Sequence, residues 1–192
     1  MPRKYVLALV IITIVFFGGV FLLFRLISGD GNEKAPNQPT ISQKVSKLSV
    51  DGKKVSYTVY GRVVGEESRR AIRITVDDTE RKLEVLQGYD ESVISSTTTS
   101  NKSSAFEAFL LALENAGFTT RDNSIKTDDR SLCSLGNRYV FETEFDDSTK
   151  IRTWSTSCNS KAVSFKGSRA TVDTLFKAQI PKYSELTNNI VL

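Results

Sequence analysis

A continuous apolar run near the N-terminus constrains this chain more than any other feature of its sequence. It extends from Tyr5 to Leu26, is dominated by Leu, Ile, Val and Phe, and contains no charged residue except Arg25 near its end. As a helix, these about 22 residues would reach about 33 Å, which is enough to cross a hydrocarbon core of about 30 Å. Only a helix satisfies all the backbone polar groups of a single segment in that environment. The sequence therefore predicts a transmembrane helix over residues 5–27, in contact with the lipid bilayer.

The same run also invites comparison with a secretory leader. It is longer than the about 7–15 apolar residues usual in a signal peptide, and no Ala-x-Ala-like cleavage site follows it. We therefore favour an uncleaved signal anchor, with a cleaved leader as the alternative. Arg3 and Lys4 precede the run, whereas Arg25 and Lys34 near its other end are partly offset by two acids. This asymmetry favours, by a narrow margin, a cytoplasmic N-terminus comprising residues 1–4.

The rest of the chain divides into a linker and one domain. Residues 28–44 combine Gly and Pro with polar residues, which predicts a flexible stalk. Of the 26 Lys/Arg and 22 Asp/Glu residues in the chain, five and two lie in residues 1–44, which leaves 21 and 20 for residues 45–192. A nearly neutral domain lacks the strong cationic footprint of nucleic-acid-binding proteins, so we expect no nucleic acid as a partner.

Alternating apolar residues predict an antiparallel meander at the start of the domain. Three segments, separated by turns at 65–68 and 77–80, each place apolar residues on one strand face. A four-residue first turn pairs Val59 with Ile74, and a tight second turn pairs Ile74 with Leu83. Both hairpins then place their apolar residues on the same sheet face, which a slip of one residue would undo.

The opposite face of this meander collects polar side chains. We expect Arg73 to lie opposite both Tyr60 and Glu84. The arrangement suits a binding surface, and the alternative is an ordinary solvent-exposed sheet face with cross-strand charge pairs. The candidate residues for the binding surface are Tyr60, Arg62, Arg73 and Trp154.

Two helices are predicted to pack on the meander. The first covers residues 104–117, where Ser104 and Glu107 have the spacing of a capping box and Phe and Leu form an apolar stripe. The Ser/Thr-rich stretch before it, residues 93–104, is expected to be a polar strand, a loop, or both in succession. The second helix begins after Ser168, a candidate N-cap residue.

A second hairpin is predicted between the helices. Its strands cover residues 138–145 and 150–157. A two-residue turn between them would pair Phe141 with Trp154, which places both rings in one aromatic cluster.

The two cysteines, Cys133 and Cys158, lie near the open end of this hairpin. In the expected register Asn137 lies opposite Cys158, and a chain reversal near Gly136 would bring Cys133 to it. A disulfide would close a loop of about 26 residues and stabilise the domain by about 3–4 kcal/mol. It would also indicate an oxidising compartment, and hence an extracytoplasmic location for residues 45–192. The alternatives are two buried thiols, or a thiol nucleophile that has neither a histidine nor a Cys-x-x-Cys motif to activate it.

The sequence lacks the residues of several common catalytic and metal-binding sites. It contains no histidine, the commonest general base and metal ligand, and it has no Walker motif or dinucleotide-binding fingerprint. We therefore expect no catalytic residue, no metal site and no cofactor. Glu142 and Glu144, on the hairpin face opposite the aromatic cluster, leave a carboxylate-based glycan hydrolase as an alternative, although acids at this spacing on an exposed strand are mostly solubilising.

Four short stretches carry a resemblance to known sequences. They read YGRVVGE at residues 60–66, RAIRITV at 70–76, WSTSC at 154–158 and LFKAQIPKY at 175–183. With these motifs the domain resembles uncharacterised single-span proteins of candidate-phylum bacteria. The resemblance implies a bacterial cell surface, and it implies no activity and no functional residues.

The expected protein is thus a single-pass membrane protein with one α+β domain outside the cytoplasm. That domain combines an antiparallel meander, packed helices and a disulfide-closed hairpin. Its expected function is that of a membrane-tethered binding or interaction module, with an envelope protein or a cell-wall polymer as the partner. The alternatives are a cell-wall glycan hydrolase, which needs two acids about 5–10 Å apart in a cleft, and a structural subunit of an envelope assembly, which needs a large exposed apolar patch.

Overall fold

The computed structural model of the chain describes residues 53–125, 128–145, 149–158 and 161–192. The transmembrane helix expected over residues 5–27 and the stalk expected over residues 28–44 lie outside the described residues. Within the described ranges, no helix is both long enough and apolar enough to cross a membrane. These ranges form an α+β domain around one antiparallel sheet, which is the fold class that the sequence predicts.

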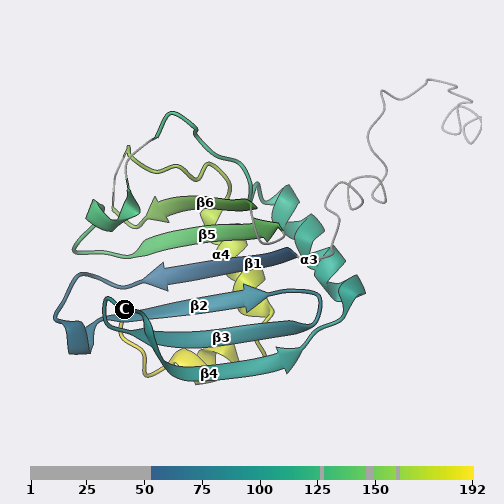
Figure 1. Ribbon diagram of the computed structural model, residues 1–192, viewed down its shortest axis with the longest axis horizontal. Helices are drawn as coiled ribbons and strands as arrows, with labels where there is room; N and C mark the ends of the chain where they lie inside the picture. Colours follow the sequence, from purple (N-terminus) through teal and green to yellow (C-terminus); the bar gives the residue numbers. More distant parts are fainter. Residues whose placement is uncertain (1–52, 126–127, 146–148, 159–160) are drawn as a thin grey trace, which may run out of the picture. The chain divides into compact units, whose positions relative to one another are not determined.

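A six-stranded antiparallel sheet forms the centre of the domain (Figure 1). In spatial order its strands are β4 (Ser92–Ser100), β3 (Glu80–Gln87), β2 (Arg70–Val76), β1 (Lys53–Tyr60), β5 (Arg138–Phe145) and β6 (Thr149–Thr156). Strands β1 to β4 form a four-stranded meander, one strand more than the three segments predicted, because the Ser/Thr-rich stretch after β3 forms the edge strand β4. The hairpin β5–β6 joins the other side of β1, so meander and hairpin share one sheet.

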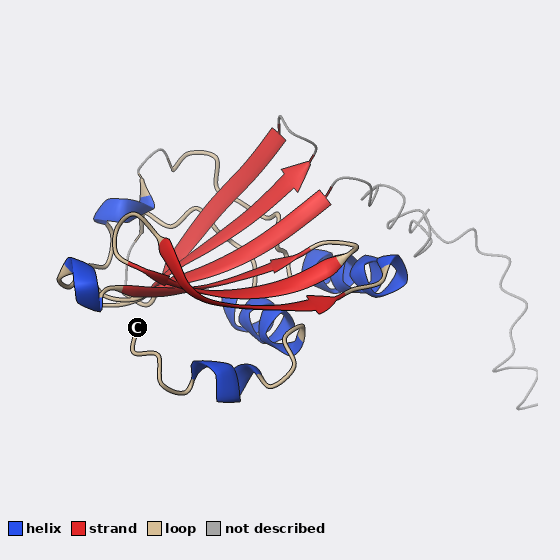
Figure 2. Cartoon of the chain, turned by 60° about the horizontal axis from the view of Figure 1, so that its bottom comes forward, coloured by secondary structure: helices blue, strands red, loops and turns tan. Residues whose placement is uncertain are grey.

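Helices α3 and α4 lie on the same side of this sheet (Figure 2). Their apolar residues pack on those of β1, β2 and β3, and Phe109 of α3 meets Phe176 of α4 edge to face at a ring-centroid distance of 5.1 Å. The opposite face of the sheet is therefore free of both helices. The helices and 3-10 turns among the described residues are α3 (Ser103–Asn115), α4 (Arg169–Ala178), α5 (Tyr183–Thr187), η1 (Glu66–Ser68) and η2 (Asp129–Ser131).

The two main helices begin in different ways. The Ser168 side chain accepts a hydrogen bond from the backbone N–H of Thr171, so it caps α4 as expected. The capping box expected for the first helix is wrong, because α3 begins one residue earlier, after Lys102, whose side chain makes no capping hydrogen bond. At its other end the chain leaves the helix through Gly117, whose φ of +75° favours glycine.

The meander has the predicted faces but only one of the two predicted registers. Strands β2 and β3 pair Ile74 with Leu83, as expected. Strands β1 and β2 are shifted by two residues from the prediction, because their connection is longer than a four-residue turn and includes η1. Val59 therefore faces Ile72 rather than Ile74. A shift by an even number keeps every side chain on its predicted face, so the apolar residues remain in the core.

The hairpin β5–β6 differs from the prediction by one residue, and this moves Trp154 to the other face of the sheet. Trp154 pairs with Val140, and Phe141 pairs with Thr153. The position of β5 is set by β1, since Tyr57 lies opposite Phe141 with ring centroids 5.4 Å apart. The register was predicted from a two-residue turn, whereas β6 already begins at Thr149 and three residues lie between the paired strand ends. The predicted cluster of Phe141 with Trp154 is therefore wrong.

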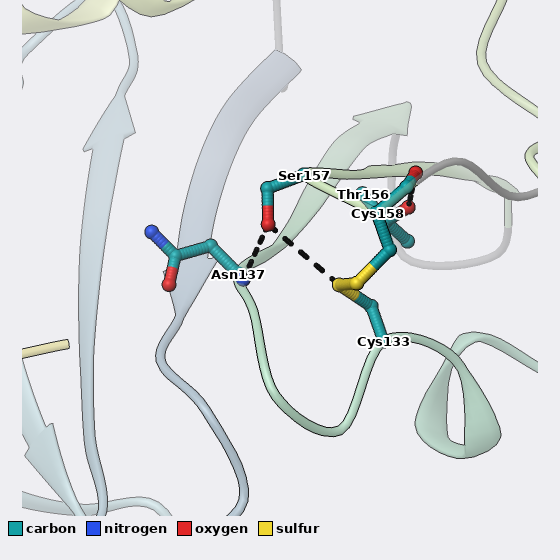
Figure 3. Close-up of a disulfide and its surroundings, with 5 residues drawn as sticks. All are labelled: Cys133, Asn137, Thr156, Ser157 and Cys158. Atoms are coloured by element: carbon teal, nitrogen blue, oxygen red, sulfur yellow. Dashed lines mark hydrogen bonds between the residues drawn. A yellow bond between two sulfur atoms is a disulfide. The ribbon is translucent and has the colours of Figure 1, made fainter.

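The predicted disulfide between Cys133 and Cys158 is present, with Cα atoms 5.5 Å apart (Figure 3). It ties the loop before β5 to the residues after β6, although Ser157, and not Cys158, lies opposite Asn137. The Ser157 Oγ accepts a hydrogen bond of 2.8 Å from the backbone N–H of Asn137 and lies 3.6 Å from the Cys133 Sγ. The loop is tight at Gly136, where an added Cβ atom would lie 2.4 Å from the Ser157 Oγ.

Candidate functional site

The sheet face that α3 and α4 leave uncovered, here called the polar face, carries two adjoining hollows. The first, the arginine pocket, has a volume of about 370 Å³, and its main lining residues are Tyr60, Arg69, Glu91, Asp129, Arg138 and Arg152. The second, the polar trough, has a volume of about 470 Å³ and continues along the sheet past Arg73 and Glu142 to Lys54 and Glu144. Tyr60, Glu91, Arg130 and Arg152 line both hollows, so the two form one continuous depression.

Tyr60, the last residue of β1, lies where the pocket meets the trough. It is 7% exposed, and its hydroxyl donates a hydrogen bond of 2.8 Å to the Glu91 Oε1. Glu91 belongs to the turn between β3 and β4, where its φ is +60°, and its other carboxylate oxygen accepts a hydrogen bond from Arg73. Burial, reinforced by the Glu91 carboxylate, raises the pKa of Tyr60 to about 12. The bridge from Tyr60 through Glu91 to Arg73 therefore holds the turn against the sheet and keeps the phenol protonated.

Asp129 supplies a buried carboxylate between two arginines. It is the first residue of η2 and is 1% exposed. Its Oδ2 lies 3.3 Å from Arg138 of β5, and its Oδ1 lies 2.5 Å from Arg152 of β6. Arg152 also reaches the Glu142 Oε1 at 3.3 Å. Because a buried charge is stable only beside a partner, Asp129 fixes both guanidinium groups at the wall of the pocket.

Arg69 differs from these arginines because no carboxylate among the described residues pairs with it. It lies in the connection before β2 and is 5% exposed. Its guanidinium carbon lies 4.4 Å from the ring centroid of Tyr89 and 5.3 Å from that of Tyr60, and its Nη1 donates to the Gly88 carbonyl. These cation–π contacts compensate part of the cost of burying a cation. Arg138 lies 4.9 Å from the same Tyr60 ring, so two guanidinium groups converge on one tyrosine.

Three of the four residues of the predicted binding surface lie on the polar face. Tyr60 and Arg73 meet at the carboxylate of the β3–β4 turn. Arg73 lies opposite Glu84 as expected, but opposite Thr58 rather than Tyr60. Trp154 reaches this face through the corrected register and packs against the small apolar cluster that contains Tyr60.

Two of the four predicted residues, Trp154 and Arg62, do not offer free polar groups to the two hollows of the polar face. The Trp154 Nε1 donates a hydrogen bond of 3.0 Å to the Ala162 carbonyl, so the polar edge of this ring is used within the domain. Arg62 is exposed and lies apart, where it lines a smaller hollow with Val191 and Leu192. The structure therefore brings Tyr60 and Arg73 together through Glu91, with Tyr60 lining both hollows and Arg73 lining the trough. Trp154 serves packing, and Arg62 lies outside both hollows.

The sequence prediction missed Arg69, Asp129, Arg138 and Arg152. The alternation along β5 places Arg138 on the same face as Glu142, so Arg138 had a usable signal. For Arg152 the sequence pattern indicated the wrong face, because the one-residue error in register assigns this residue to the core. Arg69 and Asp129 belong to connections, where no periodicity predicts which way a side chain points.

Glu142 lies on the polar face as predicted, but its surroundings suit a structural role. Its Oε1 is 3.3 Å from the Arg152 Nε, and its Oε2 accepts a hydrogen bond of 3.4 Å from the Ser56 hydroxyl. A carboxylate engaged by an arginine and a hydroxyl is poorly placed to transfer a proton to a ligand. In the part of the chain that the structure describes, no group of three or more Cys, Asp or Glu residues is arranged to hold a metal ion.

Comparisons with known proteins add no assignment to this geometry. No model of a known protein family matches the chain, and no curated protein matches it with significant sequence similarity.

Proposed function

We propose that this protein is a membrane-tethered, extracytoplasmic binding module that takes its ligand on the polar face. The observation that carries the proposal is the arginine pocket, where Arg69 and Arg138 converge on Tyr60 in a hollow of about 370 Å³. Ligand sites commonly have volumes of about 300–1,000 Å³. The pocket walls are held by the contacts of Glu91 and Asp129, and a preformed wall lowers the cost of ordering side chains on binding.

The tether is proposed from the sequence. An apolar helix over residues 5–27 and a stalk over residues 28–44 would hold the domain close to a membrane. The disulfide between Cys133 and Cys158 supports an oxidising compartment, and the resemblance to single-span bacterial proteins supports a cell surface. We therefore propose that residues 1–4 are cytoplasmic and that the domain lies outside.

The proposed partner is another envelope protein or a cell-wall polymer. The trough that continues from the pocket is lined by charges of both signs, among them Lys54, Lys82, Glu80 and Glu144. Such a lining suits an extended polar ligand better than an apolar one. Because Glu142 is engaged by Arg152, binding is favoured over carboxylate-based hydrolysis of that ligand.

Crosslinking in intact cells tests the proposal on the full-length chain. The test variant is Arg130→Glu, since Arg130 is exposed at the rim shared by pocket and trough. The matched control is Arg62→Glu, an arginine that is also exposed and lies outside both hollows. We expect an envelope component to be captured by the wild type and by the control, and several-fold less by Arg130→Glu. Capture of no component by the wild type, or equal capture by all three chains, would contradict the proposed function.

Topology is tested by a separate experiment. Intact cells are treated with protease, or with a membrane-impermeant thiol reagent after mild reduction of Cys133–Cys158. We expect the domain to be cleaved and labelled. Protection of the domain from both reagents would rule out the exterior location without bearing on what the pocket binds.

A further inference from the structure

The wall of the arginine pocket contains more positive than negative charge. Its carboxylates are Glu91 and Asp129, and its cations are Arg69, Arg130, Arg138 and Arg152. Arg73, which lines the trough, forms an ion pair with Glu91, and Arg138 and Arg152 both form ion pairs with Asp129. Arg69 is the cation to which the described residues offer no carboxylate.

We infer that the arginine pocket binds an oxyanion, that is, a carboxylate or phosphate group of the ligand, with Arg69 and Arg138 as its principal donors. This inference deepens the proposed function and rests on it, because it names the chemical group by which the ligand is held.

The first support is the state of Arg69. The residue is only 5% exposed, and a buried cation without a counter-charge is costly. Its cation–π contacts with the rings of Tyr60 and Tyr89 offset part of this desolvation cost. Of the five N–H donors of a guanidinium group, the contacts among described residues use one, on the Gly88 carbonyl. An anion in the pocket would supply both the missing charge and the missing acceptors.

The second support is the position of Arg138. It is also 5% exposed, and its guanidinium group lies over the same Tyr60 ring as that of Arg69. Burial lowers the pKa of Arg138 below its ordinary value; the Asp129 carboxylate counteracts this, and the like charge of Arg69 lowers the pKa further. An oxyanion between the two groups would relieve their repulsion and accept charge-assisted hydrogen bonds from both.

The volume and the lining of the pocket indicate which kind of chemical unit bears the anionic group. The planar fork of an arginine matches the oxygens of carboxylate and phosphate groups. A volume of about 370 Å³ leaves room for more than the anionic group, and Val63 and Tyr89 present half-exposed apolar surface beside it. This rim suits the sugar or amino-acid unit that bears the charge, which points to an acidic group on a cell-wall polymer.

The test uses the purified full-length chain in a non-ionic detergent. Sodium phosphate and sodium acetate are titrated separately against sodium chloride at equal ionic strength, with the thermal midpoint and the fluorescence of the single tryptophan as readouts. We expect one of the two oxyanions to raise the midpoint of the wild type beyond the effect of chloride. A response to phosphate alone indicates a phosphate-bearing polymer, and a response to acetate alone indicates a carboxylate-bearing one.

Two variants locate the effect. Arg69→Gln should need at least about tenfold more anion for the same response, since a hydrogen bond to a charged group contributes about that factor or more. Arg62→Gln, outside the pocket, should respond as the wild type does. No oxyanion-specific response in the wild type, or an unchanged response in Arg69→Gln, would overturn the inference.

A measurement on the unmodified chain covers the case in which Arg69→Gln does not fold. In the NMR spectrum of arginine Nε–H groups, the anion should shift the signals of Arg69 and Arg138 and leave that of Arg62 in place; the reverse pattern would overturn the inference. If the wild type binds no oxyanion but is still crosslinked to an envelope component through the polar face, the inference is wrong and the proposed function stands. If it binds the anion but captures no component, the proposed function is wrong instead.

Discussion

Tyr60 donates a hydrogen bond of 2.8 Å to Glu91, 31 residues further along the chain, and so joins the end of β1 to the turn between β3 and β4. The same carboxylate accepts a hydrogen bond from Arg73 of β2. One turn residue thus connects three neighbouring strands and lines both the arginine pocket and the polar trough. We expect measurable effects from changes at Glu91, at the buried charges nearby, and in the disulfide loop at the same end of the sheet.

Replacing Glu91 by Gln should lower the pKa of Tyr60 from about 12 toward the ordinary value of 10.0. The variant keeps the size of the side chain but removes the negative charge that disfavours the phenolate, and it leaves Arg73 free to stabilise the phenolate. The pKa is measured by titrating phenolate absorbance, with Tyr60→Phe used to assign the signal. The exposed carboxylate of Glu185 provides a control, because Glu185→Gln should leave the titration unchanged. An unaltered Tyr60 titration in Glu91→Gln would show that the carboxylate does not act on the phenol.

Alkaline pH should destabilise the domain. The folded-state pKa of Tyr60 is about 12, and burial and then the Asp173 carboxylate raise the pKa of Tyr57 above its ordinary value as well. The unfolded chain releases these protons near pH 10 and the folded chain retains them, so the stabilisation is complete below about pH 10. The part due to Tyr60 is lost as the pH rises toward about 12. Denaturant unfolding at a series of pH values checks this. Above about pH 10, the free energy of unfolding should fall less steeply with pH in Tyr60→Phe than in the wild type. An equally steep fall in both chains would contradict the assignment to Tyr60.

Removing the carboxylate of Asp129 should destabilise the domain by about 3–5 kcal/mol, because it leaves two guanidinium groups without their shared partner. The control is the exposed pair of Glu185 with Lys182, where Glu185→Gln should cost about 0–1 kcal/mol. Chemical denaturation of Asp129→Ala and Glu185→Gln under the same conditions gives both values. A loss below about 1 kcal/mol for Asp129→Ala would mean that Arg138 and Arg152 find other partners.

Loss of the disulfide should destabilise the domain by about 3–4 kcal/mol, as expected for a cross-link between cysteines with a sequence separation of 25. The double variant Cys133→Ser, Cys158→Ser is compared with the wild type by denaturant unfolding, with and without a reducing agent. The reducing agent should lower the stability of the wild type to that of the variant and leave the variant unchanged. Equal stability of all four samples would show that the cross-link adds nothing to the loop.

Substitution of Gly136 by Ala should destabilise the disulfide loop by about 1–3 kcal/mol, because the new methyl group would overlap the side chains around it. A Cβ atom at residue 136 would lie 2.4 Å from the Ser157 Oγ and 2.8 Å from the Cys133 Sγ. Gly65→Ala is the matched control, since no atom lies within 4 Å of a Cβ at that position. Thermal unfolding should separate the two variants clearly. Equal midpoints would show that the loop relaxes around the added group.

The sequence predicted those features of the fold that depend on nearby residues. Alternation assigned Val59, Ile74 and Leu83 to one face, and a short turn set the register of Ile74 with Leu83 correctly. The Ser168 cap depends on a contact three residues away, and the disulfide on the only two cysteines in the chain. Each of these needs only the short-range geometry of strands, turns and helix ends.

The sequence did not predict the register of β5 with β6 or the residues of the arginine pocket. The register depends on Tyr57, which pairs with Phe141 across a gap of 84 residues and fixes β5 on the sheet. A strand has a period of two, so an error of one residue sent Trp154 and Arg152 to the wrong face.

The sequence by itself determined the class of the domain, the apolar face of its meander and its disulfide, because these follow from the local pattern of residues. The membrane tether over residues 5–27 stays a prediction. The tertiary structure decided that Tyr60 lines the arginine pocket, that Arg73 lines the adjoining trough, and that Arg62 lies outside both hollows. It also brought Arg69, Glu91 and Asp129 from three separate connections to that pocket. Their meeting depends on how the six strands are aligned, and such long-range alignment is set by contacts between distant residues rather than by any local pattern.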